Sequence, residues 1–163
     1  MSESQDTEAN GGTPGQQMSV SAIRTGTVID HIRNEVTFKV AELLRLDEEE
    51  QVVLVGMNLS SDRVGKKGLI KVESRALTPQ EVNKIALIAP DATLNIIKNY
   101  KVAEKRRVEL PESVEGIVRC INPNCVTNKQ DVTTCFDVIG SSPPALRCIF
   151  CERTTSGTDL VLK

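Results

Sequence analysis

Four of the five cysteines form two close pairs in the last third of the chain. Four residues separate Cys120 from Cys125, two residues separate Cys148 from Cys151, and 22 residues lie between the pairs. Each pair follows a short β-like run, an arrangement typical of a tetrahedral site in which four thiolates surround one ion at about 2.3 Å. The spacing therefore predicts one structural zinc ion per chain, held by Cys120, Cys125, Cys148 and Cys151.

Disulfides and an iron–sulfur centre are the alternatives to zinc. A bridge within the short pair would be strained, Cys135 would be left over, and the sequence begins without a secretory signal. Iron–sulfur clusters usually show other cysteine spacings. Four thiolates also fill the coordination sphere, and the only histidine, His31, lies far away in the sequence, so we expect no catalysis at this metal.

The overall composition limits the possible partners. With 163 residues the chain has room for one ordinary domain or two small ones. A net charge of −2 argues against general attraction to nucleic acid or anionic membranes. No apolar run approaches the roughly 20 residues of a membrane helix. Reduced cysteines in metal spacing predict a cytoplasmic protein.

Residues 20–107 alternate between strand-like and helix-like segments. Residues 1–19 are polar and acidic and predict a disordered tail. Strands are predicted at 23–32, 51–59, 69–73, 93–97 and 100–103. One helix is expected to begin at Asn34–Glu35, and a second at Thr78, where Thr-Pro-Gln-Glu forms a capping box. This order favours an α+β sandwich with both helices on one face of a mostly antiparallel sheet.

A second, smaller unit is predicted at 114–163, after a charged, proline-marked linker at 108–113. It contains β-like runs at 117–119, 133–138, 145–147 and 160–162. Its few large apolar side chains make a small core, and a structural zinc ion stabilises such a fold by about 10–16 kcal/mol in small peptides. We therefore predict a small all-β domain in which the metal replaces much of the hydrophobic core.

The sequence contains no recognisable catalytic motif, which favours a binding protein over an enzyme. The segment Gly-Lys-Lys-Gly at 65–68 lacks the spacing of a nucleotide-hydrolysing P-loop. Cys135 shows no sign of activation and gives only generic support to a redox sensor. A nucleic-acid-binding zinc ribbon is the main alternative, because Arg119, Lys129, Arg147 and Arg153 lie near the cysteines. Basic groups are also expected there simply to balance four thiolates.

Several blocks of sequence resemble one family. VSAIRTGTVIDHI at 20–32, GLIKVE at 68–73, APDATLNII at 89–97 and NYKV at 99–102 resemble, in the same order, the regulatory chain of aspartate carbamoyltransferase. The cysteine spacing matches the zinc site of that family. The resemblance implies a ferredoxin-like allosteric domain followed by a zinc domain that contacts the catalytic chain. It also implies regulatory dimers, assembly with catalytic trimers, and a role in pyrimidine biosynthesis.

The resemblance further implies an effector site for CTP, UTP and ATP, of which CTP and UTP inhibit and ATP activates. Carried over by position, this site consists of Ala22, Ile23, Asp30, His31, Lys71, Asn95, Ile97, Tyr100, Val102 and Lys105. Ala22, Ile23 and Tyr100 would lie at the base, and Asp30 and Lys71 at the ribose. His31, Val102 and Lys105 would meet the phosphates. Asn95 and Ile97 would line the pocket, which Lys67 and Arg24 would extend toward a second nucleotide or a metal ion.

Overall fold

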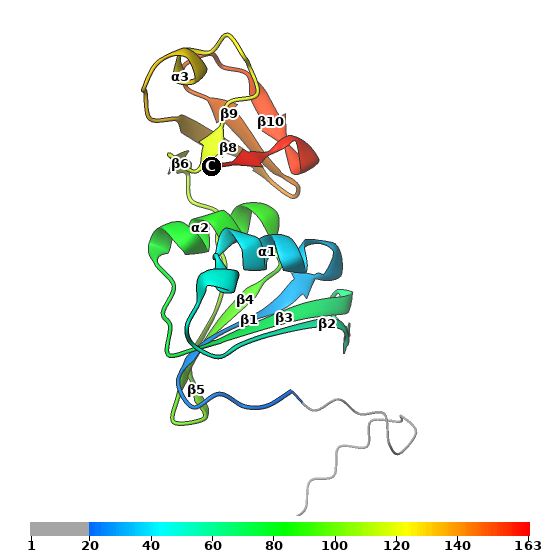
Figure 1. Cartoon of the computed structure of the whole chain (residues 1–163). Coiled ribbons are helices and arrows are strands. Elements are labelled where there is room, and N and C mark those ends of the chain that lie inside the picture. The colour runs from blue at the N-terminus through cyan, green and yellow to red at the C-terminus, as the bar shows by residue number, and fades with distance from the viewer. Residues whose placement is uncertain (1–19) are drawn as a thin grey trace, which may run out of the picture.

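A five-stranded antiparallel sheet forms the first half of the computed structural model, which describes residues 20–163. The predicted disordered tail at 1–19 lies outside the described residues. The strand order is β2-β3-β1-β4-β5. The strands are β1 (Gly26–Arg33), β2 (Val53–Ser61), β3 (Gly65–Glu73), β4 (Thr93–Lys98) and β5 (Lys101–Arg107). Helices α1 (Thr37–Leu43) and α2 (Pro79–Ile88) lie together on one face of the sheet (Figure 1). The predicted α+β architecture is therefore confirmed.

The first hydrophobic core fills the space between the sheet and the two helices. Alternate residues of the strands point into it, because side chains of a strand face opposite sides in turn. Its fully buried members include Ile29, Ile32, Val40, Ile70, Val72, Ile85, Ala86 and Leu94. The predicted capping box of α2 is present: the Glu81 N–H donates to Thr78 Oγ1, and the Thr78 N–H donates to Glu81 Oε2.

Several local predictions in this half are wrong. Asn34 does not cap α1, because its side chain instead forms two 2.8 Å hydrogen bonds with Asn58 in β2. Asn34–Val36 form a 3-10 turn and α1 begins only at Thr37; a second 3-10 turn, Leu46–Glu48, follows α1. Tyr100 does not begin a strand either: Asn99 and Tyr100 form the turn between β4 and β5, with φ of 50° and 63°. β5 also runs on to Arg107, beyond the predicted 103.

The second half holds a four-stranded antiparallel sheet and a two-stranded one. The order is β10-β9-β8-β6, with β6 (Ser113–Glu115), β8 (Cys135–Ser141), β9 (Pro144–Cys148) and β10 (Thr154–Ser156). β7 (Val118–Arg119) pairs with β11 (Val161–Leu162). The short helix α3 (Val126–Lys129), the 3-10 turn Gly157–Asp159, and strands β6 and β10 were not predicted. The core contains Val114, Ile117, Val118, Phe136, Leu146 and Leu160 beside three buried cysteines.

Helix α2 joins the two cores. Leu87, near its C-terminal end, is buried in the second core, and Leu110 packs against both. Figure 1 shows the second unit above the helices, on the side away from the first sheet. Within residues 20–163, no helix has the length and apolar character required to span a membrane.

Candidate metal centre and open face of the first sheet

The four predicted cysteine ligands converge on one point. Their sulfur atoms all lie within 4.8 Å of one another, the only such cluster of potential metal ligands in the described part of the chain. Cys120 Sγ is 3.6 Å from Cys151 Sγ, and Cys125 Sγ is 3.8 Å from Cys148 Sγ. A tetrahedron with bonds of about 2.3 Å has edges of about 3.8 Å. A disulfide requires about 2.05 Å, so these thiols fit a shared metal ion and are not bonded in pairs.

The cysteines lie on two turns that aim backbone N–H groups at the sulfurs. Cys120 follows β7 and accepts from the N–H of Asn122. Cys148 ends β9 and accepts from Phe150 and Cys151. The Arg153 N–H donates to Cys151. Such donors stabilise thiolates and orient the ligands around a metal ion.

Polar residues of α3 complete the surroundings of the first pair. The Thr127 hydroxyl donates to Cys125 Sγ at 3.2 Å. The Asn128 amide donates to the carbonyl oxygens of Cys120 and Asn122, each at 2.8 Å, and so fixes the shape of the first turn. Neither residue was singled out from the sequence, because α3 itself was not predicted.

The ionisation of the thiols shows why a cation is needed. Burial, together with the neighbouring thiols, raises the pKa of Cys120 to about 12, and burial also raises that of Cys148. Burial opposes ionisation of Cys151 as well, but the donors around it lower its pKa to about 7. Only a bound metal ion supplies the positive charge that allows all four thiolates to coexist. The residues present therefore fit a metal ion.

Cys135 lies outside this cluster. It is half-buried, and its Sγ is 4.0 Å from Glu115 Oε1. Burial and the charges of Glu115 and Asp137 raise its pKa, so the thiol is less ionised than an ordinary one. This environment is the opposite of that of a reactive cysteine.

The predicted nucleotide residues gather on the face of the first sheet that carries no helix. Val28 pairs with Lys71 on one side and with Asn95 on the other, and Asn95 pairs with Lys105. Residues opposite each other in antiparallel strands point to the same face, so these side chains form one row. Asp30 follows two residues after Val28, and the pair Ile97–Val102 lies two residues beyond Asn95, again on this open face.

The segment before β1 crosses this face and holds Ala22 and Ile23 there. Ile23 and Val20 pack against a small cluster of Val28, Leu69 and Ile97. Lys71 Nζ donates to the Ser21 carbonyl at 2.8 Å, and the Tyr100 N–H donates to the Arg24 carbonyl at 3.0 Å. In Figure 1 the blue N-terminal segment runs beneath the sheet, opposite the helices. The Tyr100 side chain is exposed at the edge of the face.

Charged groups collect at the opposite end of the face, around Asp30. Lys67 Nζ lies 2.8 Å from Asp30 Oδ1, and the His31 N–H donates to the same oxygen at 2.6 Å. Burial opposes ionisation of Asp30, yet these partners lower its pKa below the ordinary value. β1 carries one extra residue between its pairs at Ile29 and Ile32, and His31 lies in this bulge with a φ of 55°.

His31 faces cations as well as Asp30. Its Nδ1 lies 2.9 Å from Thr93 Oγ1, which points to the open face because Thr93 pairs with Asp30. Burial lowers the pKa of His31, and the charges of Lys67, Arg63 and Lys105 lower it further, against the opposing effect of Asp30. This end of the face therefore attracts negative charge. In the middle of the face, Asn95 Oδ1 is buried without a hydrogen-bond donor.

The fold and the thiolate site define the class of protein: a sheet with two helices on one face, joined to a small metal-binding unit. The match to two family models makes this specific. Residues 18–109 match the allosteric domain of the aspartate carbamoyltransferase regulatory chain, and residues 112–161 match its metal-binding domain. The chain belongs to the aspartate carbamoyltransferase regulatory chain family.

The sequences of curated relatives align with this chain along nearly their whole length. The regulatory chain of Pyrococcus abyssi is 50% identical over 147 residues, which cover 89% of this chain and 97% of the relative. That of Porphyromonas gingivalis is 48% identical over 147 residues, covering 90% and 97%. That of Phocaeicola vulgatus is 43% identical over 141 residues, covering 86% and 91%. These relatives are named as regulatory chains, so this chain is a regulatory subunit and not a catalytic one.

Proposed function

We propose that this chain is the regulatory subunit of an aspartate carbamoyltransferase and acts in pyrimidine biosynthesis in the cytoplasm. It binds CTP or UTP as inhibitors and ATP as activator on the open face of residues 20–107. Residues 108–113 link this domain to the zinc domain at 114–163, which carries the signal to catalytic trimers. Two such chains associate into a regulatory dimer. Family membership favours this function over a nucleic-acid-binding zinc ribbon.

The observation that carries the nucleotide proposal is the polarity of the open face. One end is apolar, with Ile23 packed on Ile97, and the other holds Asp30, Lys67 and His31. Ile97 pairs with Gly26, which lies four residues before Asp30 in β1. At 3.3 Å per residue, the apolar end and the charged end are therefore about 13 Å apart. A nucleotide has the same polarity, with an apolar base at one end and phosphates at the other. Its base would lie at Ala22, Ile23 and Tyr100, and its phosphates near His31 and Lys105.

The buried oxygen of Asn95 supports a polar ligand on this face. Oδ1 has no donor, although Asn95 lies in the row between Val28 and Lys105. A buried acceptor without a donor costs about 1–3 kcal/mol, and a ligand hydroxyl or amine placed here would remove that cost. Lys71 Nζ is held on the open face by the Ser21 carbonyl, which supports its proposed contact with the ribose.

Calorimetry on the zinc-loaded chain tests nucleotide binding. We expect CTP and ATP to bind the unmodified chain and Lys71→Ala to weaken both about tenfold, since it removes one charge-assisted contact. Lys39→Ala is the matched control, because Lys39 is an exposed residue of α1 on the helical side of the sheet. Absence of heat with both nucleotides, or equal weakening by the two substitutions, would contradict the proposal.

Exposed apolar side chains around the four cysteines suggest how the second domain contacts the catalytic chain. Ile121, Val126, Ile149 and Phe150, which we call the knuckle patch, lie in or next to the two cysteine turns and are 37–49% exposed. The convergence of the sulfurs brings the two turns together. Grouped apolar residues on a rigid support are typical of a protein interface. The metal would therefore shape the surface that meets the catalytic trimer.

Co-elution with catalytic trimers in size-exclusion chromatography tests the knuckle patch. Ile149→Asp should abolish association, whereas Ile139→Asp should not, although both isoleucines are 49% exposed. Ile139 lies in β8, away from the cysteine turns. Removal of the metal should also abolish association while the first domain stays folded. Equal binding by both variants, or co-elution of the metal-free chain, would overturn this part of the proposal.

A further inference from the structure

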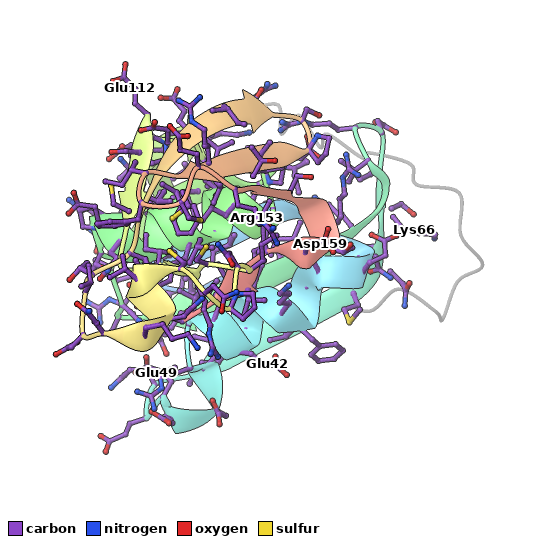
Figure 2. The ribbon with its side chains drawn as sticks, turned by 90° about the horizontal axis from the view of Figure 1, so that it is seen from above. Glu42, Glu49, Lys66, Glu112, Arg153 and Asp159 are labelled. Atoms are coloured by element: carbon purple, nitrogen blue, oxygen red, sulfur yellow. The ribbon has the colours of Figure 1, made fainter. Side chains whose placement is uncertain are left out.

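Arg75, which lies between β3 and α2, joins the end of α1 to the start of α2. Its Nη1 donates to the Leu44 carbonyl at 3.1 Å and to Glu49 Oε2 at 2.8 Å, and its Nη2 donates to Glu81 Oε1 at 2.6 Å. Leu44 and Glu49 flank the 3-10 turn that follows α1, whereas Glu81 lies in the first turn of α2. In Figure 2, Glu49 is labelled beside the cyan turn that follows α1. One guanidinium therefore binds the ends of both helices.

The backbone around Arg75 is tied to β1, the central strand of the first sheet. Thr27 Oγ1 donates to the Arg75 carbonyl at 2.7 Å, and the Ser74 N–H donates to the Thr25 carbonyl at 2.8 Å. Thr27 is only 1% exposed, and β1 pairs with β3 on one side and with β4 on the other. The opposite face of the same strand carries Asp30 of the proposed effector site. Arg75 thus connects the strand beneath that site to α2.

Glu81 holds Arg75 and the N-terminus of α2 with different oxygens. Its Oε1 accepts from Arg75, and its Oε2 accepts from the N–H of Thr78, the N-cap residue of the helix. Burial opposes ionisation of Glu81, but Thr78 and Arg75 lower its pKa below the ordinary value. The side chains of Arg75 and Glu81 are 22% and 23% exposed, so water screens this ion pair less than a pair on the surface. The start of α2 is therefore fixed to Arg75 by a partly shielded charged bond.

Helix α2 extends from this bond to the second unit. Leu87 lies six residues after Glu81, about 9 Å along the helix axis, and is buried in the second core. The other contacts between the sheet and α2 are those of the first core, and burial of apolar side chains has no preferred direction. The bonds of Arg75 are charged and directional, so they determine how α2 is oriented on the sheet.

We propose that Arg75 is a positioning residue that couples the open face to the second domain. By holding α2 to β1 and to the end of α1, it makes a displacement of β1 on nucleotide binding move α2, and with it Leu87 in the second core. Without these bonds, α2 and the sheet would shift independently, and the nucleotide would bind without changing the second domain. This inference rests on the proposed function and assigns a role to a residue outside both the expected effector site and the metal site.

Aspartate saturation of the zinc-loaded chain in complex with catalytic trimers tests this role. We expect Arg75→Met to reduce the change in half-saturating aspartate concentration that CTP causes by at least about twofold. CTP affinity in calorimetry and co-elution with the trimers should remain as in the unmodified chain, because the bonds of Arg75 lie on the helical side of the sheet. Arg75→Lys retains the charge but not the planar fork of donors, so its loss should be smaller. Arg45→Met is the matched control, because the 3.1 Å ion pair of Arg45 with Glu48 lies within the segment after α1 and its side chains are 74% and 59% exposed.

The outcomes separate the inference from the function on which it rests. If neither CTP nor ATP changes the curve of the unmodified complex, the proposed function and the role of Arg75 both fall. If the unmodified complex responds and Arg75→Met responds equally, or Arg45→Met loses as much, the role of Arg75 is refuted and the proposed function stands. Glu81→Gln is the second variant should Arg75→Met fail to fold: it keeps an oxygen for the N-cap, removes the charge that Arg75 binds, and should also reduce the response. Loss of CTP binding or of assembly in both variants would show a role in folding alone and would equally refute the inference.

Discussion

Replacement of Asp30 by asparagine tests the charged end of the open face most sharply, because the chain offers a matched control. The ion pairs Lys67–Asp30 and Arg33–Asp91 are both 2.8 Å long. The side chains of the first pair are 19% and 18% exposed, those of the second 62% and 36%. The two Asp→Asn substitutions are therefore alike in chemistry and distance and differ in burial.

The expected magnitudes follow from this difference. Asp30→Asn leaves the half-buried Lys67 without its partner and weakens the bond from the His31 N–H. We expect the free energy of unfolding to fall by about 2 kcal/mol, within the range for charged hydrogen bonds shielded from water. Asp91→Asn breaks a pair that water already screens, so its cost should be less than about 1 kcal/mol.

The pH dependence provides a second readout with a fixed sign. The partners of Asp30 lower its pKa in the folded chain, so the stabilisation is present above the unfolded value of about 3.9. It is lost as the pH falls through the lower folded pKa. The difference in unfolding free energy between the unmodified chain and Asp30→Asn should therefore have its full value at pH 7–8. It should begin to shrink below about pH 4 and disappear below the folded pKa of Asp30.

Urea unfolding followed by far-ultraviolet circular dichroism is the assay, because α1 and α2 of the first unit supply most of the helical signal. Equal costs for the two substitutions would refute the argument from burial. A stabilising effect of Asp30→Asn would show that the surrounding cations do not need this carboxylate in the ligand-free chain.

Three further predictions concern the metal, the sheet and the phosphate end. Cys148→Ser should abolish stoichiometric metal in elemental analysis of the purified chain, whereas Cys135→Ser should retain it, since Cys135 lies outside the cluster; retention in both would contradict the site. Gly68→Ala brings a methyl group into the fully buried side chain of Thr37 and should cost about 1–3 kcal/mol of unfolding free energy. Gly56→Ala in β2 is the matched control and should cost less, because Gly56 has no positive φ and the nearest atom to its new methyl group is Leu59 Cδ1 at 3.4 Å; equal midpoints in urea would refute this packing. Because burial and nearby cations lower the pKa of His31 and a bound phosphate would raise it, CTP affinity in calorimetry should increase as the pH falls from 8 to 6, and His31→Gln should flatten that slope.

Local signals in the sequence were sufficient to predict several features of the structure. The capping box at Thr78 and Glu81 uses groups three residues apart, and the cysteine pairs form turns of similar size, so neither depends on distant parts of the chain.

The failures arose where a distant residue decides the conformation. Asn34 has the chemistry of a helix cap, but Asn58 in β2 takes its side chain. Tyr100 has a strand-forming side chain, but pairing of Lys98 with Lys101 leaves it in the turn, where its N–H reaches Arg24. The effect of the Arg63 charge on the pKa of His31 likewise appears only once the β2–β3 hairpin is folded.

The central claim is that nucleotide bound to the first domain changes the behaviour of a catalytic trimer held by the second. Aspartate saturation of the cognate trimers, measured with and without the zinc-loaded chain and with CTP or ATP, tests it most directly. An effector shifts an equilibrium only through differential affinity for two states. We predict that CTP and ATP move the half-saturating aspartate concentration in opposite directions only when the chain is present, and that Lys71→Ala removes both shifts. Curves that coincide with and without saturating nucleotide in the assembled complex would contradict the account.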